Sequence, residues 1–207
     1  DSGGTEPGKG DLFHGRSGVL CQERGGIKWN PRTPRTAFLW QGPKWMLSRD
    51  AVNEKLLSQN GALGLGEIMG LKPLFERHPY VLRGGGQQRL GIALVLGTQP
   101  DLLLLDEPTK GLDPWNKKLL AELLHRYRQQ GGTVLLTTHD VEFAARFCDE
   151  CSLLFGGRMV SSAPTRTFFS ANALYTTNAA RIMNGKIKNG LLCEDVGQGL
   201  KTYKNQL

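Results

Sequence analysis

The stretch that decides the fold covers residues 102–113 and reads LLLLDEPTKGLD, an apolar run that ends abruptly in two adjacent carboxylates, Asp106 and Glu107. Four leucines between Pro100 and Pro108 predict a short strand buried on both faces, as in parallel sheets that helices cover. Side chains at the carboxyl end of such a strand point into the crevice where open α/β sheets bind ligands. Two carboxylates in that place can hold Mg²⁺ and a water molecule for the hydrolysis of a nucleoside triphosphate; an ordinary strand followed by an acidic turn is the structural alternative.

The segments around this strand alternate between the patterns of strands and helices. The expected strands are 37–40, 102–105, 133–138 and 152–155, the last followed by a hairpin turn at Gly156-Gly157. The expected helices are 50–58, 64–77 with an interruption at Pro73, 87–97, 114–129 and 141–147. The alternation predicts an α/β fold with a parallel sheet and right-handed crossovers. The helix over 87–97 is expected to turn one apolar side, with Leu90 and Leu94, toward the core.

Length and charge limit the class of protein. The 207 residues suit one medium domain, or one domain with a tail, and the formal charge of +7 favours anionic partners such as nucleotide phosphates. The basic residues are scattered, so no nucleic-acid-binding stripe is expected. The apolar runs are shorter than the roughly 20 residues that span a bilayer, and we expect no signal peptide, which points to the cytosol.

The four cysteines are too few for a disulfide framework in a domain of this size. Cys148 and Cys151 have the C-x-x-C spacing of a metal knuckle, but a tetrahedral zinc site needs four ligands and no second pair follows. The alternative is a junction of helix and strand with two small buried thiols.

Three further segments carry groups suited to phosphate. Residues 82–89 read LRGGGQQR at the start of an expected helix, where consecutive glycines let backbone N–H groups approach an anion at the positive end of the helix dipole. His139 directly follows the strand after the acidic one. Near the start of the chain, Gly3, Gly8 and Lys9 match the G-x-x-x-x-G-K pattern of a phosphate loop.

Together these motifs resemble, in order and spacing, those of the ATP-binding-cassette (ABC) ATPases. The resemblance places the signature loop at 82–89, the Walker B pair at Asp106 and Glu107, the D-loop at 111–113, the switch histidine at His139 and the Q-loop glutamine at Gln41. It implies a P-loop NTPase fold, with helices on both faces of a parallel sheet and a helical signature subdomain. ATP and Mg²⁺ are the cofactors that it implies.

The resemblance also implies a role for each site residue. Asp106 and Gln41 would hold Mg²⁺, the former through water, while Glu107 would be the general base and His139 would contact the γ-phosphate. Gln41 would also couple the metal site to the transport partner. The nucleotide-binding residues that it implies, some of them acting on a partner cassette, are Gly3, Gly8, Lys9, Gly10, Leu82, Arg83, Gly84, Gly85 and Asp113.

The sequence departs from the family pattern in the phosphate loop and in the signature loop. Gly10 stands where the phosphate loop has a Ser or Thr hydroxyl that binds magnesium, and Arg83 stands where the signature loop has a serine that touches the partner's γ-phosphate. Gly86 replaces the usual glutamine. We also expect the N-terminal strands of the full cassette, including the strand that feeds the phosphate loop, to be missing from this sequence.

Residues 109–113 and 168–182 look like the ATPase subunits of energy-coupling-factor importers of vitamins and metals, and the tail resembles the second cassette of the fused forms. This resemblance implies a head-to-tail pair with a second ABC cassette, a membrane coupling protein and a membrane protein that captures the substrate. It places the chain at the cytoplasmic face of the membrane, without nucleic acid. The expected domains are an ABC nucleotide-binding domain over 1–163, with its helical subdomain over 48–97, and a C-terminal helical extension over 164–207.

The predicted function is therefore that of an ATP-binding and ATP-hydrolysing subunit that powers uptake of a vitamin or metal. The alternative is a degenerate cassette with a structural or regulatory role and little turnover. Gly10 and Arg83 favour the alternative, while the intact Glu107 and His139 favour turnover. A third class, the cassette ATPases of DNA repair and translation, commonly carries coiled-coil, zinc-bearing or linker insertions that this sequence does not show.

Overall fold

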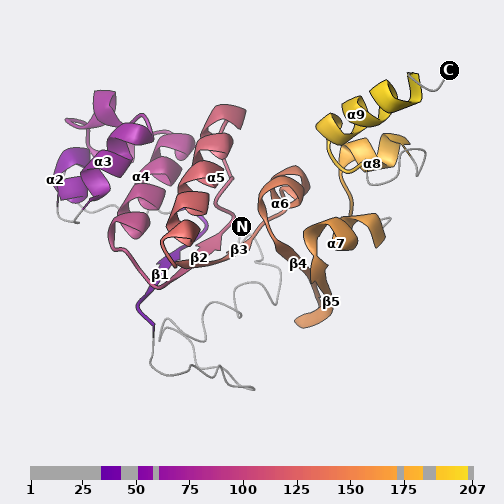
Figure 1. The fold of residues 1–207 in the computed structure, drawn as a ribbon. Helices are drawn as coiled ribbons and strands as arrows, with labels where there is room; N and C mark the ends of the chain where they lie inside the picture. Colours follow the sequence, from indigo (N-terminus) through magenta and orange to yellow (C-terminus); the bar gives the residue numbers. More distant parts are fainter. Residues whose placement is uncertain (1–33, 43–50, 58–60, 172–174, 184–189, 205–207) are drawn as a thin grey trace, which may run out of the picture. The chain divides into compact units, whose positions relative to one another are not determined.

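The computed structural model describes residues 34–42, 51–57, 61–171, 175–183 and 190–204, which are coloured in Figure 1. Its described residues form two compact units, a sheet unit that ends at Thr138 and a C-terminal unit that begins at His139. Each unit is described by itself below. The expected domain limits, 1–163 and 164–207, stay a prediction.

The sheet unit is built on three parallel strands in the order β1-β2-β3. They are β1 (Thr36–Leu39), β2 (Leu102–Asp106) and β3 (Thr133–Thr137). Leu39 pairs with Leu105, and Asp106 pairs with Thr137. Leu103 and Leu105 on one face of β2 have no exposed surface, and Leu104 on the other face is 5% exposed, which confirms the prediction of a strand buried on both faces.

The described residues of the sheet unit also form α-helices, which are labelled α2 to α5 in Figure 1, and short 3₁₀ turns. They are α2 (Val52–Leu57), α3 (Ala62–Ile68), η2 (Lys72–Leu74), η3 (Pro79–Val81), α4 (Gly84–Gly97) and α5 (Pro114–Gln129). The expected helix over 64–77 is wrong in its second half. The chain leaves the helix at Gly70, whose φ of 67° lies in the left-handed region, and Pro73 then starts a 3₁₀ turn in place of a helix.

Helix α4 lies at the centre of the sheet unit, in contact with α2, α3 and β1. The expectation of a single apolar side is wrong, because nearly all residues from Gly86 to Gly97 are buried, including Gln87 and Gln88. A helix that neighbours cover on several sides needs apolar or small residues all round, which the sequence supplies. The glycines at 84–86, expected to precede the helix, form its first turn.

The described residues of the C-terminal unit form a hairpin and four helices. Its elements are α6 (Val141–Phe147), β4 (Glu150–Phe155), β5 (Arg158–Pro164), α7 (Thr165–Ala171), α8 (Asn178–Met183) and α9 (Cys193–Lys204). β4 and β5 are antiparallel and are joined by the predicted Gly156-Gly157 turn. Phe168, Phe169 and Leu191 form its buried apolar cluster. Across the ranges that the structure describes, no helix has both the length and the apolar character needed to span a membrane.

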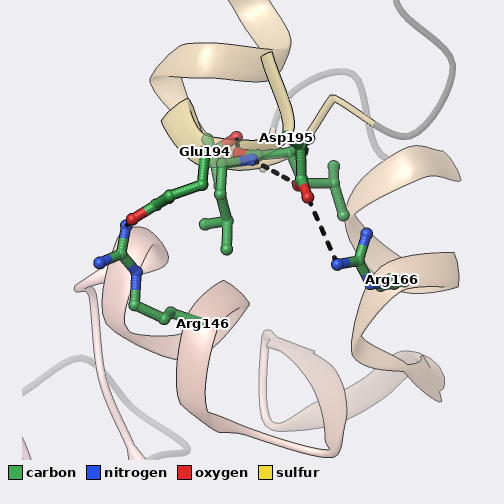
Figure 2. A network of polar contacts seen from close by, with 7 residues as sticks. Arg146, Arg166, Glu194 and Asp195 are labelled. Carbon is green, nitrogen blue, oxygen red and sulfur yellow. Dashed lines mark hydrogen bonds and ion pairs between the residues drawn. The ribbon is translucent and has the colours of Figure 1, made fainter. Parts of the chain in front are cut away.

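The start of α9 is held by two carboxylates, which Figure 2 shows from close by. Glu194 pairs with Arg146 of α6 at 2.8 Å, and Asp195 pairs with Arg166 of α7 at 3.5 Å. Asp195 Oδ2 also accepts hydrogen bonds from the backbone N–H of Leu192, at 3.0 Å, and of Leu191, at 3.3 Å. Asp195 thereby satisfies N–H groups at the helix start that have no partner inside the helix.

Candidate functional site

The two carboxylates at the end of β2 are fixed by threonines of the neighbouring strand. Thr137 Oγ1 donates to Asp106 Oδ1 at 2.6 Å, and Thr138 Oγ1 donates to Glu107 Oε2 at 3.4 Å. The backbone N–H of Glu107 donates to the Thr137 carbonyl at 3.0 Å, and Glu107 is buried, with 9% of its surface exposed. Parallel pairing of β2 with β3 therefore presents both carboxylates at the carboxyl edge of the sheet in fixed orientations.

The backbone at Glu107 is strained. Its φ of 47° lies in the left-handed region, which costs a residue with a Cβ about 1–2 kcal/mol. Such conformations persist where the surrounding structure over-determines them, and they cluster at functional sites. At Glu107 the backbone departs from the extended conformation of the strand. Asp106 is therefore the last residue of β2, and Glu107 is the first residue after it.

Gln41 stands at the same edge of the sheet. It is exposed and lies two residues beyond Leu39, and Leu39 pairs with Leu105, two residues before Glu107. Asp106, Glu107 and Gln41 offer only oxygen acceptors toward a cation, which is the ligand chemistry that Mg²⁺ prefers. Within the ranges that the structure describes, no three or more His, Cys, Asp or Glu side chains are grouped to hold a metal.

The predicted signature loop forms the N-terminus of α4. Leu82 is buried, and Arg83 is the exposed N-cap residue, whose side chain forms no capping hydrogen bond with the first turn. Gly84 and Gly85 begin the helix. Uncapped N–H groups at the start of a 14-residue helix, next to an exposed guanidinium, suit an anionic group such as phosphate.

The start of α4 packs directly on the loop that follows the carboxylates. A Cβ on Gly85 would lie 2.6 Å from the carbonyl oxygen of Gly111, whose own φ is 74°. Gln88 Nε2 donates to the Pro108 carbonyl at 3.1 Å. Gln88 is buried and holds the signature helix to the loop, and sequence analysis gave it no role. Its burial with a backbone carbonyl as partner is visible only in the structure.

Asp113, predicted to reach a partner cassette, is the N-cap residue of α5. Its carboxylate accepts hydrogen bonds from Asn116 N at 2.8 Å and Asn116 Nδ2 at 2.7 Å, and these bonds lower the pKa of Asp113. Both interactions favour the charged form at the positive end of the helix. Trp115 beside it is 73% exposed, so this end of α5 presents an aromatic ring and a carboxylate on the surface.

The remaining predicted site residues are His139 and the residues of the phosphate loop. His139 is exposed and opens the C-terminal unit, where its carbonyl accepts from Val141 N at 3.0 Å. The phosphate-loop residues lie outside the described residues; they are Gly3, Gly8, Lys9 and Gly10. The threonines at the end of β3 were missed as site residues, although a Thr-Thr pair closing the strand next to an acidic strand end is a usable signal.

Comparison with known proteins gives matches over most of the chain. The family described as "AAA domain, putative AbiEii toxin, Type IV TA system" matches residues 75–145. A putative ABC transporter ATP-binding protein of Bacillus thuringiensis is 35% identical over 91% of this chain, which spans only 38% of that relative. A putative ABC transporter ATP-binding protein of Geobacter sulfurreducens is 30% identical over 84% of this chain and 78% of the relative. The energy-coupling factor transporter ATP-binding protein EcfA2 of Mycoplasma genitalium is 30% identical over 85% of this chain and 62% of the relative.

Solved structures have the same fold. An ATP-binding subunit of an ABC transporter superimposes with a TM-score of 0.70 at 22% identity, over 87% of this chain and 83% of that one. The protein cbiO1 of Clostridium perfringens, part of the ABC transporter complex cbiONQ, gives a TM-score of 0.69 at 23% identity, over 96% of this chain and 85% of that one. The fold is thus the P-loop NTPase cassette that the motifs predicted. The chain belongs to the ATP-binding proteins of ABC transporters.

Proposed function

We propose that this chain binds and hydrolyses ATP and powers an ABC importer of the energy-coupling-factor class. The observation that carries the proposal is the pair Asp106 and Glu107, held at the sheet edge by Thr137 and Thr138 and joined through the next loop to the signature helix. The importer class is supported by the Mycoplasma relative and by the EcfA2 protein of Methanospirillum hungatei, which is 36% identical over 65% of this chain.

The residues at the edge of the sheet have different proposed roles in ATP hydrolysis. Mg²⁺, when bound with ATP, neutralises charge on the phosphate oxygens. Asp106 and Gln41 would hold it, and the hydrogen bond from Thr137 fixes one oxygen of the Asp106 carboxylate. Glu107 accepts a proton from the attacking water, and the hydroxyl of Thr138 keeps its carboxylate in position.

The remaining predicted residues act on the phosphates and on the partner. Lys9, with Gly3, Gly8 and Gly10, would cradle the phosphates of this chain's own nucleotide, and His139 would contact the γ-phosphate. Gly84 and Gly85 at the N-terminus of α4, with Leu82 and Arg83 before them, would face the nucleotide of a second cassette in a head-to-tail pair, where Asp113 also reaches.

The proposed assembly lies at the cytoplasmic face of a membrane and involves no nucleic acid. A second cassette, a membrane coupling protein and a substrate-capturing membrane protein are its proposed partners. The relative cbiO1 is part of the complex cbiONQ, which supports an assembly of several components. The transported substrate is set by a different polypeptide in this proposal.

Measurement of ATP hydrolysis tests the assigned base. Glu107→Gln should reduce Mg²⁺-dependent turnover by about 10²-fold or more while ATP binding persists, because the amide cannot accept the proton from water. Glu122→Gln, an equivalent change at an exposed position of α5, should leave turnover as it is. Equal rates for the wild type and Glu107→Gln would exclude Glu107 as the base.

A degenerate cassette with a structural or regulatory role is the second candidate, because Arg83 is exposed at the helix start where the family has serine. Gly10→Ser restores a hydroxyl ligand for magnesium, and Arg83→Ser restores the hydroxyl of the signature loop. If the residues now at positions 10 and 83 limit the rate, each change should raise turnover measured at saturating ATP. ATP binding without turnover in all of these variants would favour the second candidate, and an unchanged rate would contradict our account of both departures.

A further inference from the structure

The C-terminal unit brings two cysteines together outside the proposed ATP site. Cys148 is the C-cap residue of α6 and Cys151 is the second residue of β4, so the chain turns from the helix into the strand within these four residues. Both cysteines are free and partly buried. The Cys148 thiol lies near enough to Cys151 to lower the pKa of the Cys151 thiol.

Thr165 at the start of α7 fixes this turn from the other side. Its hydroxyl donates to the Cys148 carbonyl at 2.7 Å and lies 3.4 Å from the Cys151 sulfur, and its N–H donates to the Asp149 carbonyl at 2.9 Å. Thr165 is buried. The pairing of Cys151 with Ala163 in the hairpin adds a further constraint. The turn is thus held at several points, which keeps the two sulfurs adjacent.

Among the described residues, Cys148 and Cys151 have no further ligand of the kind that a metal knuckle needs. In the part of the chain that the structure describes, no third His, Cys, Asp or Glu joins the two cysteines in a metal-binding group. Cys193 is exposed on α9 and is not grouped with them. Two adjacent thiols at C-x-x-C spacing, without further ligands, have the arrangement of a redox-active dithiol.

We propose that Cys148 and Cys151 are a redox-active dithiol that closes to an intramolecular disulfide on reaction with a low-molecular-weight disulfide, of the glutathione type. The Cys151 thiolate attacks one sulfur of the disulfide RSSR, forms a mixed disulfide and releases RS⁻. The thiol of Cys148 then loses its proton, attacks the Cys151 sulfur and releases a second RS⁻. The two protein thiols are oxidised and RSSR is reduced to two RSH once the protons are returned.

The electrostatics of the pair assign the first attack to Cys151. Hydrogen bonding from Cys148 is the largest effect on the Cys151 thiol and lowers its pKa. Burial acts in the opposite direction, Thr165 lowers the pKa, Glu150 raises it, and the net result is a pKa of about 7. Cys151 therefore carries more thiolate at neutral pH than an ordinary thiol with a pKa of about 8.5. The thiolate is the nucleophile in disulfide exchange.

The test treats the whole chain with mixtures of oxidised and reduced glutathione, blocks the remaining thiols by alkylation and maps the products by mass spectrometry. The wild type should form a 148–151 disulfide, seen as a peptide that has lost two hydrogens and takes up no alkylating agent at either position. Cys148→Ser should stop at a glutathione adduct on Cys151. Cys193→Ser is the matched control and should close the disulfide as the wild type does.

A second readout covers the case in which a variant folds poorly. Alkylation of Cys151 in the reduced wild type should have its midpoint near pH 7, and Cys148→Ser or Cys148→Ala should move the midpoint upward, with circular dichroism used to confirm the fold. Alkylation of both residues in every glutathione mixture, or stable glutathione adducts on wild-type Cys151 without ring closure, would overturn the proposal. Neither readout depends on ATP hydrolysis, so this proposal and the proposed function can fail separately.

Discussion

At the scale of the residue, the contact between Gly85 and Gly111 explains why both loops carry glycine. The backbone of α4 approaches the Gly111 carbonyl so closely that no side chain fits between them. Gly111 also needs its φ of 74°, which residues with a Cβ rarely adopt. The geometry of the proposed ATP site therefore depends on glycine at positions 85 and 111 as well as on the two carboxylates.

Gly85→Ala should destabilise the sheet unit by about 1–3 kcal/mol, because the added Cβ would lie 2.6 Å from a backbone oxygen that cannot rotate away. Gly84→Ala is the matched control, since a Cβ there meets nothing within 4 Å. Urea unfolding measures the free energy of both variants. Equal stability of Gly85→Ala and Gly84→Ala would show that the loop after Glu107 moves to accommodate the added methyl group without a loss of stability.

At the scale of the element, the two carboxylates at the start of α9 stabilise it by different means. Glu194 forms an exposed ion pair with Arg146, of a kind that contributes about 0–1 kcal/mol. Asp195 is only 22% exposed at its side chain and accepts from two backbone N–H groups at the helix start. The hydrogen bonds of Asp195 should therefore contribute more to the helix than the ion pair of Glu194 does.

Asp195→Ala should lower stability by about 1 kcal/mol and increase hydrogen exchange of the backbone amides in α9, because two N–H groups lose their acceptor. Glu194→Ala should change both quantities less. Hydrogen exchange monitored peptide by peptide separates the two variants, and a larger effect from Glu194→Ala would mean that the ion pair with Arg146 dominates.

Secondary structure was largely predictable where a periodic hydrophobic pattern lies between residues that begin or end a helix, such as Pro and Gly. Helix α5 matches the prediction at both ends, since Asp113-Pro114 begins it and Gly131-Gly132 follows it. The helix expected over 64–77 failed because its hydrophobic spacing continues past Gly70, where the backbone cannot stay helical. The burial of α4 on nearly all sides depends on its neighbours, which a local pattern does not reveal.

At the scale of the whole molecule, the motifs gave the family and the carboxylates, but they could not give the contacts between distant segments. The hydrogen bonds of Thr137 and Thr138 with the carboxylates depend on which strand lies next to β2. The contact of Gln88 with Pro108 likewise requires α4 to lie over the loop that follows Glu107. Sequence spacing alone identifies neither neighbour.

The proposed head-to-tail pair leads to a prediction about association. ATP with Mg²⁺ should increase the dimer fraction of Glu107→Gln, because a bound nucleotide that is not hydrolysed keeps the two cassettes together. Asp113→Ala in the same background should weaken the dimer, since Asp113 lies at the exposed start of α5 beside Trp115. Sedimentation over a range of protein concentrations measures both. A purely monomeric chain at all ATP concentrations would contradict the proposed pairing.

The pairing of β1 with β2 also has a consequence for the order of folding during synthesis. Thr36 pairs with Leu102, which lies 66 positions later in the chain. At about 5–20 residues per second, Thr36 is made about 3–13 s before Leu102. Helices α2, α3 and α4 lie within that interval and form local contacts with one another. We therefore expect the helices to assemble first, with β1 joining the sheet only when the leucine strand arrives.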